Sequence, residues 1–272
     1  MKMRRVLPTG AAGGVGTRLR RILAGRFEEL VLSDLKAPAD IAPHESFRPA
    51  DLSDLAQVQA AVEGVDGIIH LGGLPLEFEW EEMLQTNIVG TYNLFESARL
   101  AGVNRVVFAS SNQVVGFYPR ERRFGINVPP RPSSRYGVTK AFGESLAALY
   151  CDKHGMRVLC IRIGRVHDLP EDMRRLSLWI KPEDLAQLMC IGLEHPEIHY
   201  DIVYGVSHNE RGWYDNQRAY DLGYRPEGRA EDHLMHALEQ QKASQPDPVA
   251  DRFMGARLCA REFDGDIDRA GT

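Results

Sequence analysis

Ser111, Tyr136 and Lys140 are the residues of this sequence whose types and spacing could together oxidise an alcohol. Tyr136 and Lys140 are four residues apart in a segment with a helical pattern, so both side chains project from the same helix face. An alcohol that loses a hydride also needs a base for its hydroxyl proton. A tyrosine phenolate can be that base, and the spacing therefore predicts hydride transfer from an alcohol to a nicotinamide.

The pair needs electrostatic help, because a phenol with a pKa of about 10 is a poor base at neutral pH. Lowering that pKa by about 3 units takes roughly 4 kcal/mol. A lysine ammonium about 4 to 5 Å away, at an effective dielectric constant of about 20, supplies roughly 3 to 4 kcal/mol. We therefore expect Lys140 to lower the pKa of Tyr136, with the positive nicotinamide ring adding to the effect. Ser111 closes a strand-like run 25 residues earlier and can hydrogen-bond the substrate oxygen.

A glycine-rich loop near the N-terminus predicts where the nicotinamide cofactor binds. A short apolar run breaks into glycines and then into an arginine-rich amphipathic segment, which is the order strand, tight turn, helix. Gly10 turns the chain, Gly13 lets the backbone approach a pyrophosphate, and Gly16 lets the helix pack on the strand. The helix N-terminus offers the anion unpaired N–H groups. Asp34 closes the next apolar run, where an acid binds the adenosine ribose and favours NAD over NADP.

The elements that must position these residues follow from the hydrophobic pattern. Apolar runs alternate with helical patterns, which predicts an α/β fold with a Rossmann-like, doubly wound parallel sheet. We expect strands at 6–7, 30–33, 46–48, 67–71, 103–110, 157–163 and 198–204, and helices at 15–24, 55–62, 80–101, 136–154, 182–194 and 231–241. Asp54 is a candidate N-cap, and Gly102 is placed to end the long helix. We expect Pro8 to end the first strand, because it lacks a ladder donor.

Length and composition limit the possible functions. The 272 residues suffice for one large-cored domain, with 43% hydrophobic and 26% charged residues. A net charge of −5 argues against nonspecific binding to nucleic acid or to an anionic membrane. No apolar run approaches the length of a signal peptide or a membrane span. Four widely spaced cysteines predict reduced thiols and a cytoplasmic location, and the scattered histidines predict no metal site.

We expect one domain spanning residues 1–272, with two functional parts. We expect residues 1–163 mostly to bind the dinucleotide and residues 164–272 to supply a small C-terminal substrate-binding region. From residue 243 onward the sequence shifts to Ser, Gln, Pro and Asp, so we expect an irregular and partly mobile tail.

The motifs that carry the chemistry also carry a resemblance. The pattern Thr9-Gly10-x-x-Gly13-x-x-Gly16, the trio of Ser111, Tyr136 and Lys140, and the later Leu222-Gly223-Tyr224-Arg225-Pro226 resemble the extended short-chain dehydrogenases/reductases. Along nearly its whole length the chain further resembles the bacterial uronate dehydrogenases, for example in Asn87-Ile88-Val89-Gly90-Thr91 and Gly212-Trp213-Tyr214-Asp215-Asn216. That resemblance implies oxidation of the C1 hydroxyl of cyclic galacturonate or glucuronate with NAD, giving an aldarolactone.

The resemblance also implies which residues contact the ligands. For the cofactor these are Gly10, Gly13, Gly14, Val15, Gly16, Asp34, Asp51, Leu52, Leu71, Gly72, Gly73, Asn87, Tyr136 and Lys140. It implies that Ser111, Asn112 and Arg174 face the sugar. A guanidinium such as that of Arg174 binds a carboxylate through two parallel hydrogen bonds.

Three expected substrate-site positions depart from the family. Pro75 stands where the family usually has a serine, Gln113 where it has a histidine, and Arg165 where it has a serine. Because a hydrogen-bonding pocket discriminates strongly, the loss of two hydroxyl donors changes what fits. Arg165 could bind the substrate carboxylate, accept a more anionic sugar, or fill the pocket.

Two other functions stay open at this point. Nucleotide-sugar epimerases and dehydratases share the glycine loop and the Tyr/Lys pair, although little chain beyond residue 163 is available to enclose a nucleotide diphosphate. A non-catalytic NAD-sensing protein could dispense with the catalytic side chains, all of which are present. For partners we expect a small sugar or sugar acid, no nucleic acid and no membrane. The helices at 80–101 and 136–154 carry apolar residues on more than one face; the resemblance implies a homo-oligomer packed through them, and simple packing on the sheet is the alternative.

Overall fold

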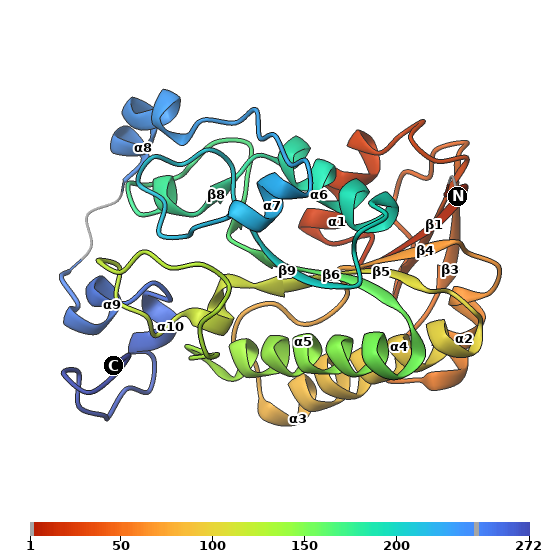
Figure 1. Cartoon of the computed structure of the whole chain (residues 1–272), viewed down its shortest axis with the longest axis horizontal. Coiled ribbons are helices and arrows are strands. Elements are labelled where there is room, and N and C mark those ends of the chain that lie inside the picture. The colour runs from red at the N-terminus through yellow and green to blue at the C-terminus, as the bar shows by residue number, and fades with distance from the viewer. Residues whose placement is uncertain (1–2, 242–244) are drawn as a thin grey trace.

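Seven parallel strands form the main sheet of the computed structural model, which describes residues 3–241 and 245–272 (Figure 1). Their spatial order is β3-β2-β1-β4-β5-β6-β9. In chain order they are β1 (Arg5–Thr9), β2 (Glu29–Asp34), β3 (Glu45–Pro49), β4 (Gly67–His70), β5 (Arg105–Ser111), β6 (Arg157–Ile163) and β9 (Tyr200–Gly205). Strand order reverses between β1 and β4, where a doubly wound sheet opens a crevice at its carboxyl edge. The predicted Rossmann-like fold class is confirmed.

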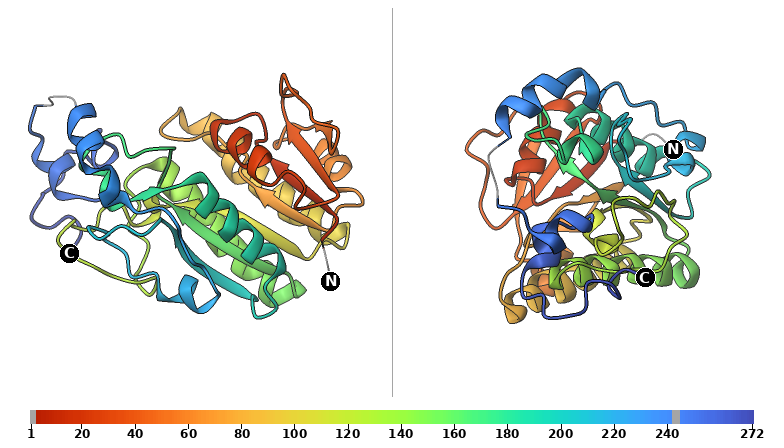
Figure 2. Two further views of the ribbon diagram at one scale, coloured as in Figure 1. Left: turned by 90° about the horizontal axis from the view of Figure 1, so that it is seen from above. Right: turned by 90° about the vertical axis from the view of Figure 1, so that its left-hand side faces the viewer.

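Helices cover both faces of the sheet (Figures 1 and 2). One face is packed by α1 (Gly14–Ile22) and α6 (Pro182–Glu194), and the other by α2 (Leu55–Val62), α4 (Gly90–Leu100) and α5 (Arg135–His154). Strands buried on both faces need apolar side chains on both, which explains the nearly continuous apolar runs of the sequence. Within residues 3–241 and 245–272, no helix is both long enough and apolar enough to cross a membrane.

The predicted signals for the ends of two helices are confirmed. The Asp54 carboxylate accepts hydrogen bonds from the backbone N–H groups of Ala56 and Gln57 at 2.9 and 3.2 Å and so caps α2. Gly102, two residues after α4, has a φ of +73°, a conformation that favours glycine.

Pro8 lies inside β1, so the prediction that it ends the strand is wrong. It is paired with Ile69 of β4, and β1 continues to Thr9. On the other side, the register to β2 pairs Val6 and Thr9 and passes over the proline. The strand tolerates Pro8 because the missing N–H falls in this gap.

The predicted helix over 80–101 is interrupted by a wider turn. It consists of α3 (Trp80–Met83), the π-helical segment η1 (Leu84–Val89) and α4. Such π-helical turns often occur at functional sites. The predicted helix over 231–241 likewise begins as a 3₁₀ turn, η4 (Ala230–His233), and continues as α8 (Leu234–Gln240).

The C-terminal part builds one end of the molecule, beside the short parallel pair β7 (Arg165–Val166) and β8 (Trp179–Ile180) (Figure 2). The predicted irregular tail is wrong only where it forms two short helices, α9 (Pro248–Arg252) and α10 (Arg257–Ala260); turns and loops make up the rest of its described residues. Phe253, Met254 and Cys259 of this segment are buried, and Phe253 pairs with Pro119. Residues 243 and 244 of the predicted tail lie outside the described residues.

Candidate active site

The structure brings Ser111, Tyr136 and Lys140 together at the carboxyl edge of the sheet. Ser111 ends β5, and Tyr136 lies in the first turn of α5, which is capped by the Ser134 hydroxyl accepting from the Gly137 N–H at 3.1 Å. The Ser111 hydroxyl lies near enough to the Tyr136 phenol to favour its ionised form. The Lys140 Nζ lies 5.7 Å from the centroid of the Tyr136 ring. A serine and a lysine therefore flank the tyrosine, as the spacing predicts.

The electrostatics of this trio differ from the expectation. Burial raises the pKa of Tyr136 to about 12, and only the nearby Ser111 hydroxyl opposes this rise. Burial also lowers the pKa of Lys140 to about 8. The prediction that Lys140 by itself lowers the pKa of Tyr136 is therefore wrong for the protein without ligands. The ammonium lies over the faces of the Tyr136 and Phe108 rings, and desolvation of the phenol outweighs its attraction.

His70 is fully buried next to Lys140, a position that was not predicted from the sequence. Thr9 Oγ1 and His70 Nδ1 are 2.8 Å apart, and Thr9 Oγ1 also accepts from the Gly72 N–H at 3.0 Å. Burial, together with the Lys140 charge, lowers the pKa of His70 to about 3. The imidazole is therefore neutral, and the Thr9 hydroxyl at the end of β1 links it to the loop after β4.

The glycine loop forms an open backbone cradle that fits a pyrophosphate. Gly10 has a φ of +64°, and a Cβ there would lie 2.9 Å from the Gly72 N. A Cβ on Gly16 would lie 2.4 Å from the Gly10 O, so the helix can approach the loop only without one. Gly13 and Gly14 are exposed, and no side chain caps α1. The N–H groups of this first turn, which includes Val15, are thus oriented toward any anion bound there.

Asp34 is held at the end of β2 beside this loop. One carboxylate oxygen accepts from the Ala12 N–H at 2.9 Å, and the other from the Leu35 N–H at 2.7 Å. Each carboxylate oxygen can accept a further hydrogen bond, so the side chain still fits a ribose hydroxyl.

The other expected cofactor residues line the same edge of the sheet. Leu71, Gly72 and Gly73 directly follow β4, and a Cβ on Gly72 would lie 2.8 Å from the Leu52 side chain. The neighbouring Asp51 carboxylate accepts from the backbone and side chain of Ser53 at 2.9 and 2.8 Å, which fixes the turn before α2.

Asn87 connects the loop after β4 to the catalytic helix. It lies in η1, where its Oδ1 accepts from the Leu74 N–H at 2.7 Å. Its Nδ2 donates to the Leu74 O at 3.0 Å and to the Thr139 Oγ1 at 3.1 Å. Because the whole amide is engaged in these contacts, Asn87 positions the cofactor-side loop against α5.

A second cluster, beyond Ser111, consists of Asn112, Tyr214, Trp213 and Arg174. The Asn112 Nδ2 donates to the Tyr214 hydroxyl at 3.5 Å, and the Arg174 guanidinium lies 5.7 Å from the centroid of the Trp213 ring. Arg174 donates one hydrogen bond to the Met254 O. Its Nε is buried and has no hydrogen-bond partner among the described residues. Burial lowers the pKa of Arg174 to about 10, yet the group stays cationic at neutral pH.

Other partners engage the side chains at two of the divergent positions. The Gln113 Oε1 accepts from the Ser133 hydroxyl. Arg165, whose side chain is 44% exposed, forms a two-pronged ion pair with Glu171 at 2.7 and 3.1 Å. Pro75 is exposed in the loop that follows β4. Trp213, Tyr214 and Met254 were not predicted to line the site, since only the fold brings them to it.

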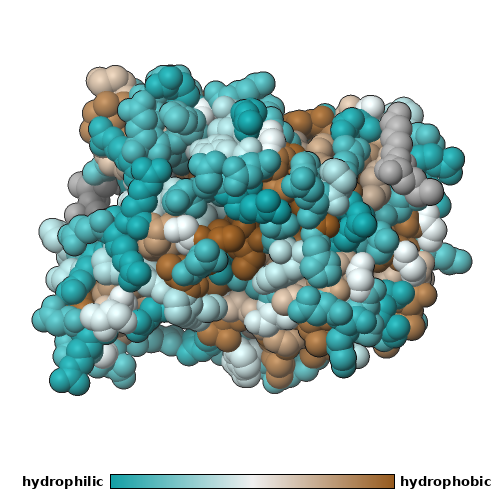
Figure 3. All heavy atoms as spheres, viewed as in Figure 1, coloured by the Kyte–Doolittle hydropathy of each residue, from teal (hydrophilic) through white to brown (hydrophobic). Residues whose placement is uncertain are grey.

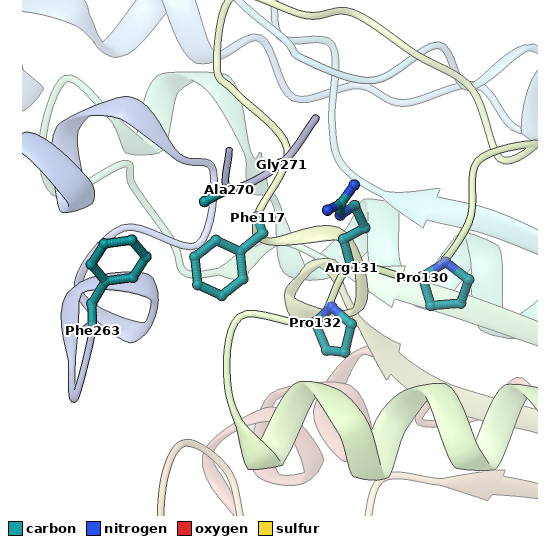
Figure 4. Close-up of a pocket in the computed structure, with 7 residues that line it drawn as sticks. All are labelled: Phe117, Pro130, Arg131, Pro132, Phe263, Ala270 and Gly271. Carbon is teal, nitrogen blue, oxygen red and sulfur yellow. The ribbon is translucent and has the colours of Figure 1, made fainter. Parts of the chain in front are cut away.

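A separate pocket of about 370 Å³ lies between the segment 117–132 and the C-terminal residues (Figure 4). Its lining is mainly apolar, with Phe117 and Phe263 side by side. Arg131, its only charged lining residue, donates to the backbone oxygen of Thr272. None of the predicted catalytic, cofactor or substrate residues lines this pocket.

Comparison with known proteins agrees with this geometry. The NAD dependent epimerase/dehydratase family matches residues 6–168. Uronate dehydrogenase from Pseudomonas putida is 44% identical over 248 residues, covering 91% of each chain. The crystal structure of uronate dehydrogenase from Agrobacterium tumefaciens superimposes with a TM-score of 0.91 at 41% identity, covering 96% of this chain and 98% of that one. A mutant of the A. tumefaciens enzyme complexed with NAD gives the same TM-score, covering 95% and 97%. The chain therefore belongs to the NAD dependent epimerase/dehydratase family, within the extended short-chain dehydrogenases/reductases.

Proposed function

We propose that this protein is an NAD-dependent dehydrogenase that oxidises the C1 hydroxyl of a cyclic uronate, galacturonate or glucuronate, to its lactone. The observation that carries the proposal is the partly buried Arg174, whose Nε is buried without a partner among the described residues. Its guanidinium lies over Trp213, whose neighbour Tyr214 accepts a hydrogen bond from Asn112, the residue after Ser111. A carboxylate is the group that a buried, unpaired guanidinium binds best. Relatives named uronate dehydrogenase support this substrate class.

The glycine loop and Asp34 would hold the cofactor, with the pyrophosphate at the N-terminus of α1 and the ribose at the carboxylate. When bound, NAD supplies the hydride acceptor and a positively charged ring. Asp51, Leu52 and the loop after β4 would line the remainder of that site. The chain's own contribution there is preorganised, because the Asn87 contacts fix the loop before any ligand arrives.

At the reacting carbon, three side chains share the work. The Ser111 hydroxyl holds the C1 oxygen against the Tyr136 phenol, which takes the hydroxyl proton as the C1 hydrogen leaves as hydride. Lys140 and the positive charge that NAD supplies would together stabilise the phenolate, against the burial that raises the pKa of Tyr136 to about 12. Asn112 and Arg174 orient the sugar from its acid end.

The division of labour along the chain follows from the same placement. We assign residues 1–163 mainly to NAD binding and residues 164–272 to the sugar. The support for this division is that Arg174, Trp213, Tyr214 and Met254 all belong to the later part.

We also propose that the enzyme is cytoplasmic and forms a homo-oligomer. All four cysteines are free thiols, as in a reducing compartment. Large apolar side chains on α3, α4 and α5 are 45 to 57% exposed: Trp80, Tyr92, Leu100, Val138 and Leu149. Figure 3 shows hydrophobic residues along the lower side of the molecule, where α4 and α5 lie. A second copy packed there would cover them.

The test is NADH formation with galacturonate and glucuronate, measured beside galactose and glucose as uncharged controls. We expect rapid NADH release with a uronate and far slower release with the matched neutral sugar. NADH that accumulates in solution distinguishes this activity from an epimerase, which returns its hydride to the sugar. No turnover of either uronate would overturn the proposal.

A further inference from the structure

A second guanidinium shares the Trp213 ring with Arg174. The Arg120 Cζ lies 5.7 Å from the centroid of that ring, the same distance as the Arg174 Cζ. The two cations are close enough that the charge of Arg120 lowers the pKa of Arg174, second only to burial. Burial also lowers the pKa of Arg120 itself. Two partly desolvated positive charges therefore lie at the end of the site where the acid group of the sugar is proposed to bind.

Backbone carbonyls of residues 250–254 hold both cations. The Arg120 Nε donates to the Phe253 O at 3.1 Å, and its Nη2 donates to the Ala250 O. Arg174 donates to the Met254 O. These acceptors are neutral, so they fix the direction of each guanidinium without cancelling its charge.

The nearby carboxylates do not neutralise the pair. Asp172 forms its ion pair with Arg175, and Glu171 pairs with Arg165 and Arg175. Asp251 acts to raise the pKa of Arg120, but burial has the larger effect and the pKa is lowered overall. Across the described ranges, 3–241 and 245–272, neither Arg120 nor Arg174 has a carboxylate oxygen within ion-pairing distance. Two desolvated cations without a counterion destabilise a protein unless a ligand supplies the negative charge.

We propose that Arg120 is a specificity-determining residue that forms, with Arg174 and Trp213, a two-cation subsite for the anionic group at C6 of the sugar. This inference rests on the proposed function for the position of the sugar. Residues 250–254 are the positioning element of the subsite, because their carbonyls direct both guanidiniums. The second charge selects an anionic sugar over its neutral counterpart and does not act at the reacting C1 atom.

The test compares Arg120→Gln, which removes the charge but keeps a donor for the carbonyls, with Arg120→Lys, which keeps the charge. We expect Arg120→Gln to raise the KM for the uronate about tenfold, a loss typical of one charged hydrogen-bonding partner, with kcat nearly unchanged. The KM for the matched neutral hexose and the Kd for NAD should not change. Arg120→Lys should recover most of the uronate affinity. Circular dichroism and the thermal midpoint check that each variant is folded.

A purely structural anchor would behave differently. If Arg120→Gln raises the KM of the neutral hexose as much as that of the uronate, if it changes neither, or if Arg120→Lys is no better than Arg120→Gln, the inference is overturned. If Arg120→Gln fails to fold, Arg120→Lys is compared with the wild type on the uronate and on the neutral hexose. A change in the KM of the uronate alone supports the subsite, and equal changes for both sugars, or none, overturn it.

A hexose 6-phosphate as a further substrate separates this inference from the proposed function. If the wild type oxidises the hexose phosphate and not the uronate, and Arg120→Gln raises its KM, the substrate assignment is wrong and the anion subsite stands. If the wild type oxidises the uronate and Arg120→Gln leaves its KM unchanged, only the subsite fails. If the wild type oxidises neither sugar, the uronate and the hexose phosphate are each titrated into the NAD-loaded protein by calorimetry. Absence of binding overturns the subsite.

Discussion

The Lys140 ammonium lies 5.7 Å from the centre of the Tyr136 ring, one turn away on α5, and 5.0 Å from the centre of the Phe108 ring. Aromatic faces stabilise a cation in a place where little water reaches it. The pKa values nevertheless lie near 12 for the phenol and near 8 for the amine, because burial dominates both. The resting site therefore holds a protonated phenol, and the base forms only when further positive charge enters the cleft.

Replacing the phenol tests whether Tyr136 is the base. Tyr136→Phe should lower kcat by about 10²- to 10⁴-fold, the usual contribution of a positioned base, while NAD affinity and the folded structure are preserved. Stopped-flow absorbance at the NADH band gives the rate, and calorimetry gives the Kd for NAD. A variant that keeps the wild-type rate would exclude Tyr136 from proton transfer.

The lowered pKa of Lys140 makes stability depend on pH in a defined direction. In the folded protein its pKa is about 8, against an ordinary 10.5, so the unfolded chain binds more protons between these values. The free energy of unfolding should therefore rise with pH across this window, by at most about 3 kcal/mol from this group. Lys140→Met should be more stable than the wild type at pH 7, and the gap should shrink toward pH 10.5. Urea titrations at several pH values measure it, and a constant gap would contradict the buried cation.

Two arginines with different surroundings should respond differently to the same change. Arg174→Lys should lower kcat/KM for the uronate by roughly 10- to 100-fold, because a lysine cannot reproduce the fork of a buried guanidinium. Arg165→Lys should change it by no more than about twofold, since Arg165 is exposed and already paired with Glu171. Initial rates over a range of uronate concentrations decide this. Equal losses in the two variants would mean that Arg165 leaves Glu171 to bind the sugar.

The tight packing of the glycine loop predicts a stability effect at one position. A Cβ on Gly16 would lie 2.4 Å from the Gly10 O and 2.8 Å from Ala11, so Gly16→Ala should destabilise the protein by about 1 to 3 kcal/mol and weaken NAD binding. Gly125→Ala is the matched control, because its Cβ would meet nothing closer than 3.8 Å. Thermal unfolding with and without NAD measures both. An unchanged thermal midpoint for Gly16→Ala would show that the loop shifts to accommodate the added methyl group, contrary to the prediction.

The sequence was sufficient to predict the sheet and the place of the catalytic trio. Strands buried on both faces leave long apolar runs, and helix caps such as Asp54 and Gly102 depend on local chemistry that can be read directly. Ser111 and Tyr136 were predictable as neighbours because parallel strands end at one edge and the following helix returns along them.

The departures depend on contacts that only the folded chain creates. Nothing in the sequence around Arg165 or Gln113 shows that Glu171 and Ser133 engage them. The tail looks polar, yet a few apolar residues such as Phe253 and Met254 suffice to dock it. The pKa of Tyr136 depends on how completely the fold removes water, which residue spacing does not report.

The wide helical turn at Asn87 has a mechanical consequence. Its amide is hydrogen-bonded to the backbone of Leu74 and to the hydroxyl of Thr139. Thr139 lies between the catalytic tyrosine and lysine in the sequence. The loop nearest the dinucleotide and the helix that carries the proton acceptor are thereby joined through one amide, and they cannot separate without breaking its bond to Thr139 or both of its bonds to Leu74. We therefore expect the motion that admits a sugar and releases a lactone to occur on the other side of the site, around Arg174 and Trp213.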